Sequence, residues 1–259
     1  MKLRALILTA ALATPALCPA AVSVIGLNFA GRNSHTVAPG EAAGAPEFRQ
    51  ENWNNLTGDF GGAGGTGGIV EQTGAGIGIT VFYDAPNAWS TEGLGAGADR
   101  ELMAGYLDSN NGANGGTNLG SFGNQPYVAV TGLPASYAEM GYKIVVYSDG
   151  GGNANRGGLI WAETFGGDVT NHTGTTISDV LEIRDNATFS GTYTEATSGS
   201  TSGNYLVLGP IYGETSFVIR TQELNFRIPI NAIQIVTPEP SRAALLLIGV
   251  AALALRRRR

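Results

Sequence analysis

Short β-patterned segments, each bounded by glycine, asparagine or aspartate, recur along most of the chain. Glycine accounts for 39 of the 259 residues, and it is disfavoured inside helices. Alternating or β-branched apolar runs predict strands at 22–29, 76–83, 127–131, 142–148, 159–163, 204–208, 216–220 and 230–236, with weaker patterns at 177–183 and 187–195. This succession predicts an all-β fold.

The fold expected from about ten short strands is a two-sheet antiparallel β-sandwich, in particular a jelly roll. Such a sandwich buries one apolar face of each sheet and needs no disulfides. A solenoid is the alternative, but no fixed period recurs among the strands. We therefore expect one domain over residues 22–236, which is long enough to bury a real core.

One short helix is expected in this sandwich, over residues 99–107. Asp99 can cap it, and Glu101 lies in its first turn. Four apolar residues would share one face: Leu102, Met103, Tyr106 and Leu107. The polar run 108–112 would end the helix.

Two segments before the helix are expected to be irregular. Residues 30–66 are mostly polar, which is typical of a loop. The glycine-rich run 61–68 predicts a mobile loop or turn. It does not predict a phosphate-binding loop, because no Lys-Ser/Thr pair follows it.

The first 21 residues have the plan of a secretory signal peptide. Lys2 and Arg4 precede an apolar run at 5–16, and small residues at 20–21 suit cleavage. Cys18, the chain's only cysteine, would leave with this segment, so the mature chain would have no disulfide and no thiol chemistry. A lipoprotein signal is disfavoured because Leu17 is bulky where a small residue is needed.

The last 23 residues combine three features in order. Pro238-Glu239-Pro240 is an extended, proline-flanked motif; residues 243–255 carry no charge; and the chain ends in Arg256, Arg257, Arg258 and Arg259. Thirteen apolar residues reach about 20 Å as a helix, against a hydrocarbon core of about 30 Å. This predicts a short, temporary transmembrane helix with the arginines on the cytoplasmic side. A buried C-terminal helix is the alternative, and the four arginines argue against it.

This tail, residues 237–259, resembles the PEP-CTERM sorting tail of bacteria that make extracellular polysaccharide. The resemblance implies that an exosortase, a membrane transpeptidase-like protease, recognises Pro238, Glu239 and Pro240. It also implies that the helix and arginines are then discarded. Partners would be the exosortase and the secretion machinery. The protein would be anchored briefly in the inner membrane and end in the cell envelope, at the surface or in the extracellular matrix.

The charge of residues 22–236 excludes two classes of partner. Eight basic residues stand against twenty acidic ones, a net charge of about −12, and Lys143 is the only lysine. A nucleic-acid-binding surface needs a basic stripe that neutralises phosphates, which this span does not offer. Anionic lipid is excluded by the same argument.

The body of the chain has a resemblance of its own. The runs 52–56, 133–138 with 142–149, 191–195 and 229–236 are similar to ectodomains often joined to this tail in Verrucomicrobia-type bacteria. The resemblance implies a galactose-binding-like or lectin-like sandwich. No matching run is a catalytic motif.

Catalytic chemistry leaves no signature in this sequence, and we name no catalytic residue. His35 and His172 are the only histidines; no nucleophile-elbow motif accompanies them, and they do not define a zinc site. A pair of carboxylates could serve a polysaccharide hydrolase, but that pair is defined by a separation in space. An extracellular hydrolase therefore stays as the alternative function.

Three oxygen-rich loops are the candidates for a metal ion. They contain Asp108, Asp149 and Asp168, each among Asn, Ser or Gly. Such loops suit a structural calcium ion, but Asp/Asn/Gly clusters are also ordinary turns, and none matches the twelve-residue calcium loop. We expect turns and no cofactor.

Two tryptophans in polar surroundings are the candidates for ligand binding. Trp53 and Trp89 could each offer a flat ring on which a sugar stacks, whereas Trp161 follows Leu159 and Ile160 and is expected in a strand. The sequence thus predicts a non-enzymatic envelope protein that binds exopolysaccharide weakly or has a structural role.

Overall fold

The computed structural model describes residues 23–65, 68–109, 125–151, 156–165, 174–185, 187–225 and 227–238. The expected signal peptide, residues 239–259 of the expected tail, Asp168 and His172 lie outside these ranges. Within the ranges, no helix is long and apolar enough to cross a membrane. The described residues belong to one compact unit, Val22–Pro238.

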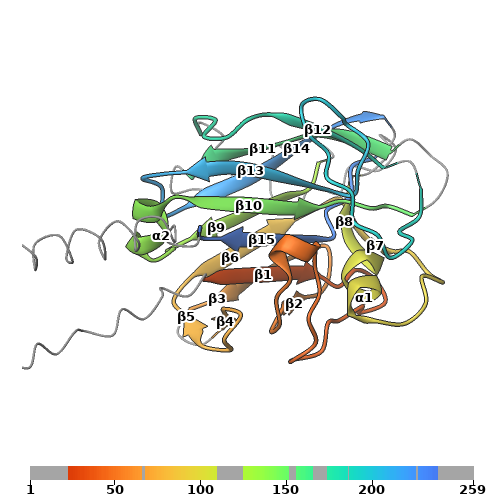
Figure 1. The fold of residues 1–259 in the computed structure, drawn as a ribbon, viewed down its shortest axis with the longest axis horizontal. Coiled ribbons are helices and arrows are strands. Elements are labelled where there is room, and N and C mark those ends of the chain that lie inside the picture. Colours follow the sequence, from red (N-terminus) through yellow and green to blue (C-terminus); the bar gives the residue numbers. More distant parts are fainter. Residues whose placement is uncertain are drawn as a thin grey trace, which may run out of the picture. The chain divides into compact units, whose positions relative to one another are not determined.

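Two large sheets form the domain (Figure 1). The five-stranded sheet has the order β13 (Tyr205–Ile211), β10 (Tyr142–Tyr147), β15 (Ala232–Val236), β1 (Val24–Phe29), β2 (Asn54–Leu56). The six-stranded sheet has the order β12 (Leu181–Asp185), β11 (Arg156–Thr164), β14 (Phe217–Asn225), β9 (Tyr127–Thr131), β6 (Thr80–Asp84), β3 (Phe60–Gly64). Two small two-stranded sheets pair β4 (Ile69–Val70) with β5 (Gly76–Ile77), and β7 (Asn87–Ser90) with β8 (Gly105–Asp108).

The main core lies between the two large sheets, which confirms the predicted all-β sandwich at this level. Ile25, Ile144 and Ile233 come from the five-stranded sheet, and Val128 and Ile219 come from the six-stranded sheet; all five are fully buried in one cluster. Alternate residues point the other way, as pleated strands require. Every strand pair is antiparallel except β1 with β2, which is parallel, so the five-stranded sheet is mixed.

A second core covers the outer face of the five-stranded sheet. Val145, Tyr147 and Ala232 point to that side and pack with Trp53 and with residues of α1 (Ala98–Ala104). Strands β1 and β15 are therefore buried along their whole length. Burial on both faces explains why apolar residues occupy both faces of these two strands, with Asn28 and Gln234 buried among them.

The predicted helix is real but shorter, and its cap is different. Helix α1 ends at Ala104, because Gly105 turns into β8 and carries Tyr106 and Leu107 into that strand. Asp99 does not cap the helix: its carboxylate accepts hydrogen bonds from the Gly44 backbone N–H (2.9 Å) and from Arg49 (2.9 Å).

Elements that were not expected include β2, which lies inside the predicted loop 30–66, and the short strands β4 and β7. A second short helix, α2 (Ala135–Met140), follows Pro134, which suits a helix start. A 3-10 turn, η1, spans Pro46–Phe48.

Two sequence predictions about strands are wrong. Residues 61–64 of the glycine-rich run belong to β3 instead of a loop, because they pair with β6 and because Gly61 leaves room for Tyr83: a Cβ there would lie 2.6 Å from the tyrosine oxygen. Residues 187–195 form no strand; an isolated bridge links Glu195 to Tyr205 of β13.

The two ends of the described domain lie side by side. Strand β1, in red, is next to β15, in blue, although they come from opposite ends of the chain (Figure 1). Thr237 donates its N–H to the Ser23 carbonyl (3.1 Å), and its hydroxyl accepts the Ser23 N–H (3.0 Å). Thr237 is 1% exposed, whereas the next residue, Pro238, is exposed, so Thr237 is the last buried residue of the described domain.

Candidate functional site

A turn after β1 packs closely on the two-stranded sheet of β7 and β8. Gly31 has a φ of +63°, and a Cβ at this position would lie 2.7 Å from the Gly105 Cα and 2.8 Å from the Ser90 hydroxyl. A Cβ on Gly105 would in turn lie 2.6 Å from the Gly31 nitrogen. Only glycine permits this approach. It places Arg32 and Asn33 beside the strand that carries Trp89.

Trp89 presents its ring to solvent. Along β7, Ala88 and Ser90 are buried while Trp89 points outward with 41% of its surface exposed. The guanidinium carbon of Arg32 lies 5.2 Å from the centre of the indole ring, within the range of a cation–π contact. A cation therefore lies over the exposed aromatic ring.

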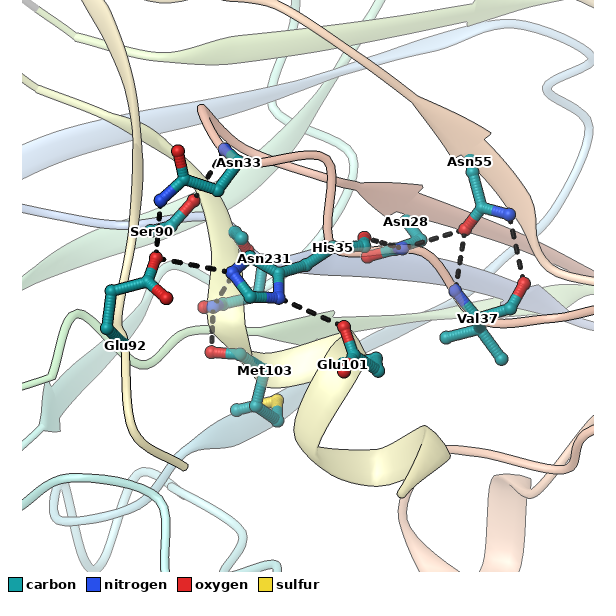
Figure 2. A network of polar contacts seen from close by, with 11 residues as sticks. Asn28, Asn33, His35, Val37, Asn55, Ser90, Glu92, Glu101, Met103 and Asn231 are labelled. Carbon is teal, nitrogen blue, oxygen red and sulfur yellow. Dashed lines mark hydrogen bonds and ion pairs between the residues drawn. The ribbon is translucent and has the colours of Figure 1, made fainter. Parts of the chain in front are cut away.

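His35 connects this turn to two carboxylates (Figure 2). Its Nδ1 lies 2.9 Å from Glu101 Oε2 on α1, and its Nε2 lies 3.4 Å from Glu92 Oε1. The same Glu92 oxygen accepts a hydrogen bond from the Asn33 side-chain amide at 2.6 Å. The backbone N–H of Asn33 donates to the Ser90 hydroxyl at 3.2 Å.

Three asparagine amides hold this network, of which Asn28 and Asn231 are buried and Asn55 is exposed (Figure 2). Asn28 donates to the His35 carbonyl (2.9 Å) and to Asn55 Oδ1 (2.8 Å). Asn55 pairs with the backbone of Val37 through its amide oxygen and nitrogen, both at 3.0 Å. Asn231 donates to the carbonyls of Met103 (2.8 Å) and Gly105 (3.0 Å), which fixes the junction of α1 and β8. The loop carrying His35 is thus anchored by side chains of the sandwich itself.

We call the group Arg32, Asn33, His35, Trp89 and Glu92 the Trp89 surface. The hydrogen bond from Asn33, followed by the contact with His35, lowers the pKa of Glu92. Glu92 therefore presents an ionised carboxylate. Amide, carboxylate and guanidinium groups beside an exposed aromatic ring are the groups that bind a ligand with one apolar face and several hydroxyls.

The same geometry argues against a histidine base at this site. A general base needs a free nitrogen within hydrogen-bond reach of the proton that it removes. Both ring nitrogens of His35 face carboxylates, at 2.9 Å and 3.4 Å. We therefore assign His35 to holding the turn against α1 and Glu92.

Trp53 does not offer a ligand platform, so this part of the sequence prediction is corrected. It is 5% exposed, and its indole N–H donates to the Gln50 carbonyl at 3.2 Å. Its ring lies against Gly26 of β1, where a Cβ would come within 2.6 Å of Cε3. Trp161, expected in a strand, lies in β11, partly buried, and its indole N–H donates to Glu163 at 2.8 Å.

The candidate metal ligands are engaged within the protein. Asp108 is fully buried and pairs with Arg227 at 2.5 Å, and burial raises its pKa. Asp149 is buried and accepts the Gly151 N–H at 3.0 Å. Asp168 lies outside the described residues. Among the residues that are described, no three His, Cys, Asp or Glu side chains are grouped so that they could hold a metal ion.

An open depression of about 350 Å³ lies elsewhere on the surface. It is lined by Ala42, Arg49, Gln50, Glu51, Gln72 and Thr73. Arg49 donates hydrogen bonds there to Asp99 at 2.9 Å and to the Ala42 carbonyl at 2.7 Å. No aromatic ring lines it, and we therefore place the candidate site at the Trp89 surface.

Sequence reasoning found Trp89 but missed its neighbours. Arg32, Asn33 and Glu92 belong to polar stretches that look like ordinary loops. The one available signal was Gly31 directly after a strand, since a glycine there can mark a tight turn. The spacing of residues in the sequence does not show which segment that turn packs against.

Comparison with known proteins adds little. No protein-family model matches the chain, and no curated protein matches it. Among solved structures, the K1 cleaved adhesin domain of Lys-gingipain from Porphyromonas gingivalis W83 is similar at 15% identity, with 57% of this chain and 81% of that chain covered. The TM-score is 0.30, and no conclusion is drawn from it.

Proposed function

We propose that this chain is an exported, non-enzymatic envelope or matrix protein that binds carbohydrate weakly at the Trp89 surface. The observation that carries the proposal is the exposed ring of Trp89, which has the Arg32 guanidinium over it and is held beside Asn33 and Glu92. The finer fold assignment, a jelly roll of the galactose-binding or lectin-like kind, is part of this proposal. It rests on the resemblance of the body of the chain.

The chemistry of the surface suits a neutral sugar. The C–H groups of a pyranose face pack on an aromatic ring, while its hydroxyls hydrogen bond to amides and carboxylates at the rim. The site is a surface and not a closed pocket, so a ligand would keep much of its hydration. Weak binding follows, and repeated sugars along a polysaccharide would compensate through many contacts.

Export and processing form the second part of the proposal. Residues 1–21 would be removed as a signal peptide, and an exosortase would act at Pro238, Glu239 and Pro240 after transient anchoring by 243–255. The end of the fold supports this: Thr237 is buried and bonded to Ser23, while Pro238 is exposed. A cut after Thr237 would therefore leave both cores intact.

The binding proposal is tested with a glycan array and with the polysaccharide of the producing cells. Residues 22–238 form one unit with their own cores, so this domain is the sample. Binding is measured with calcium and with chelator. We expect binding that Trp89→Ala abolishes and Tyr212→Ala preserves, since Tyr212 is also an exposed aromatic, at 62%, outside the Trp89 surface.

Other outcomes discriminate between the functions. Absence of binding in both conditions would replace the lectin proposal by a structural role. Binding only with calcium would assign a metal to the protein. Release of product from a polysaccharide, lost on replacing one carboxylate, would establish the alternative, an extracellular hydrolase.

Processing is tested by mass spectrometry of the mature protein from a host that has the exosortase. We expect an N-terminus at residue 21 or 22 and a C-terminus near 238–240. An intact Arg259 as the main C-terminus would refute this part of the proposal.

A further inference from the structure

The open depression of about 350 Å³ shares no lining residue with the Trp89 surface. It lies between a loop around η1 and the turn that joins β4 to β5. Ala43 and Gln50 exchange two backbone hydrogen bonds, of 3.0 and 3.1 Å, which close the loop. The Asn52 side-chain amide donates to the Gln72 carbonyl at 2.8 Å and ties the loop to the turn. Both walls of the depression are therefore held by the fold.

One lining residue, Gln50, is almost completely buried, with 3% of its surface exposed. Its side-chain amide ends a chain of hydrogen bonds that starts at the backbone N–H of Ala45. This N–H donates to the Tyr147 hydroxyl (3.0 Å), and that hydroxyl donates to Gln234 Oε1. Gln234 Nε2 then donates to Gln50 Oε1 (3.0 Å). Because a backbone N–H can only donate, the direction of every later bond is set, and the last group of the chain is the Gln50 NH₂.

The Gln50 amide nitrogen has only a long contact within the protein. It lies 3.4 Å from the Glu51 carbonyl oxygen, at the far end of the range for a hydrogen bond. An amide nitrogen carries two hydrogens, and among the described residues no second acceptor faces this one. A buried donor without a good acceptor costs free energy. An oxygen atom bound in the depression would supply that acceptor.

Two charged side chains lie at the rim of the depression. The Arg49 guanidinium has five N–H donors, of which two bond to Asp99 (2.9 Å) and to the Ala42 carbonyl (2.7 Å). Its side chain is 44% exposed, so further donors reach the solvent. Glu51 is exposed, and within the part of the chain that the structure describes no side chain pairs with its carboxylate. The depression thus offers donors from Gln50 and Arg49 and an acceptor from Glu51.

We propose that this depression is a second binding site, for a sugar unit that carries a carbonyl oxygen, as a uronate or an N-acetyl amino sugar does. The carbonyl oxygen accepts hydrogen bonds from Gln50 and Arg49, and a ring hydroxyl donates to Glu51. No aromatic ring lines the depression, so recognition here depends on directed hydrogen bonds and not on stacking. The volume is at the small end of ligand pockets, which suits one sugar unit. This site does not depend on the Trp89 surface.

An NMR titration of the domain 22–238 tests the site. The probes are glucuronate and N-acetylglucosamine, and glucose is the control because its pyranose form has hydroxyls but no carbonyl group. We expect the side-chain N–H signals of Gln50 to shift and saturate at millimolar concentrations of one or both probes, and not with glucose. A larger response to glucuronate assigns a carboxylate ligand, and a larger response to N-acetylglucosamine assigns an acetamido ligand. No shift with either probe, or the same shift with glucose, would overturn the proposal.

Arg49→Ala and Arg184→Ala are a matched pair of variants. Each arginine side chain is 44% exposed and paired with a carboxylate, but only Arg49 lines the depression. Arg49→Ala should raise the Kd of the better probe about tenfold, as the loss of a hydrogen bond from a charged group does. Arg184→Ala should leave the Kd unchanged. Equal effects of the two variants would contradict the site.

Two further variants separate the donor and the location. Gln50→Met keeps the length of the side chain and removes its donor, so binding should be lost; its melting temperature shows whether the domain is folded. If this variant does not fold, the two arginine variants decide. Trp89→Ala should leave the Gln50 shift unchanged. Loss of the shift in Trp89→Ala would place the sugar at the Trp89 surface and refute a second site.

Discussion

The guanidinium of Arg32 lies over the indole ring of Trp89, 5.2 Å from the ring centre. The turn at Gly31 places the first residue, and β7 places the second. The contact fixes the orientation of an exposed ring and places the hydrogen-bond donors of Arg32 over it. A surface tryptophan held in this way loses less conformational freedom when a ligand stacks on it.

Replacement of Arg32 by alanine should therefore weaken sugar binding about threefold to tenfold, since it removes a donor worth about 1 kcal/mol and frees the ring. Thermal unfolding should change little, because both partners are at the surface. The measurement is a ligand titration of wild type and Arg32→Ala, with Arg184→Ala as a control at another half-exposed arginine. Tighter binding by Arg32→Ala would mean that the guanidinium blocks the ring.

The two tryptophans should differ sharply in their effect on stability. Trp53→Ala removes a buried ring and should lower the free energy of unfolding by about 3–5 kcal/mol. Trp89→Ala removes an exposed ring and should cost about 1 kcal/mol or less. Urea unfolding of both variants checks this, and similar losses for both would contradict the assigned positions.

Asp108 should make stability depend on pH. Burial raises its pKa above the ordinary 3.8, and this effect exceeds that of the Arg227 ion pair. The folded chain then binds the proton more tightly than the unfolded chain, so the contribution of Asp108 to stability is present below pH 3.8 and is lost as pH rises through the folded pKa.

Asp108→Asn should remove this dependence. The stability of wild type minus that of Asp108→Asn should fall as pH rises across that window. Urea unfolding at several pH values measures the difference, and Asp59→Asn, an aspartate without a buried ion pair, is the control. A difference that grows with pH would show that the ion pair with Arg227 dominates.

Glu92 offers a local probe of the Trp89 surface. The hydrogen bond from Asn33 is the largest cause of its lowered pKa, so Asn33→Ala should raise that pKa towards the ordinary value. A carboxyl group whose pKa is lowered in the folded chain contributes stability at pH values above its ordinary pKa. Any stability from this contact is therefore lost as pH falls. Titration of the carboxyl carbon by NMR checks the shift. No change in Asn33→Ala would mean that the contact does not persist in solution.

The strands were predictable where local pattern and burial agree. Residues 127–131 were predicted as a strand and form β9 with the same bounds. Val128 and Val130 point to the core, and Tyr127 and Ala129 to the other face, so the alternation carried the information. The segments of β1 and β15 were also predicted as strands, because most of their residues are apolar, which suits burial on both faces.

The failures arise where a distant partner decides the conformation. Strand β3 has almost no side chains of its own, and its conformation comes from pairing with β6. Trp53 lies in a polar stretch, but Gly26 on β1 provides the space that its ring fills. Neither relationship can be seen from the neighbouring sequence.

One residue of the candidate site could be singled out from the sequence, and its neighbours could not. Trp89 stood out as an aromatic in polar surroundings, and it is exposed in the structure. Its partners come from a turn more than fifty positions earlier and from the loop that follows β7, and only the packing of Gly31 on Gly105 brings them together. Spacing in the sequence does not report such a contact.

The central claim is that the ring of Trp89 contacts a sugar. The most direct measurement is calorimetric titration of the domain 22–238 with the best ligand from the array, for wild type, Trp89→Ala and Tyr212→Ala. The account predicts that Trp89→Ala raises the Kd about tenfold or more, equivalent to about 1.4 kcal/mol, while Tyr212→Ala leaves it unchanged. An unchanged Kd for Trp89→Ala would place the ligand elsewhere and contradict the account.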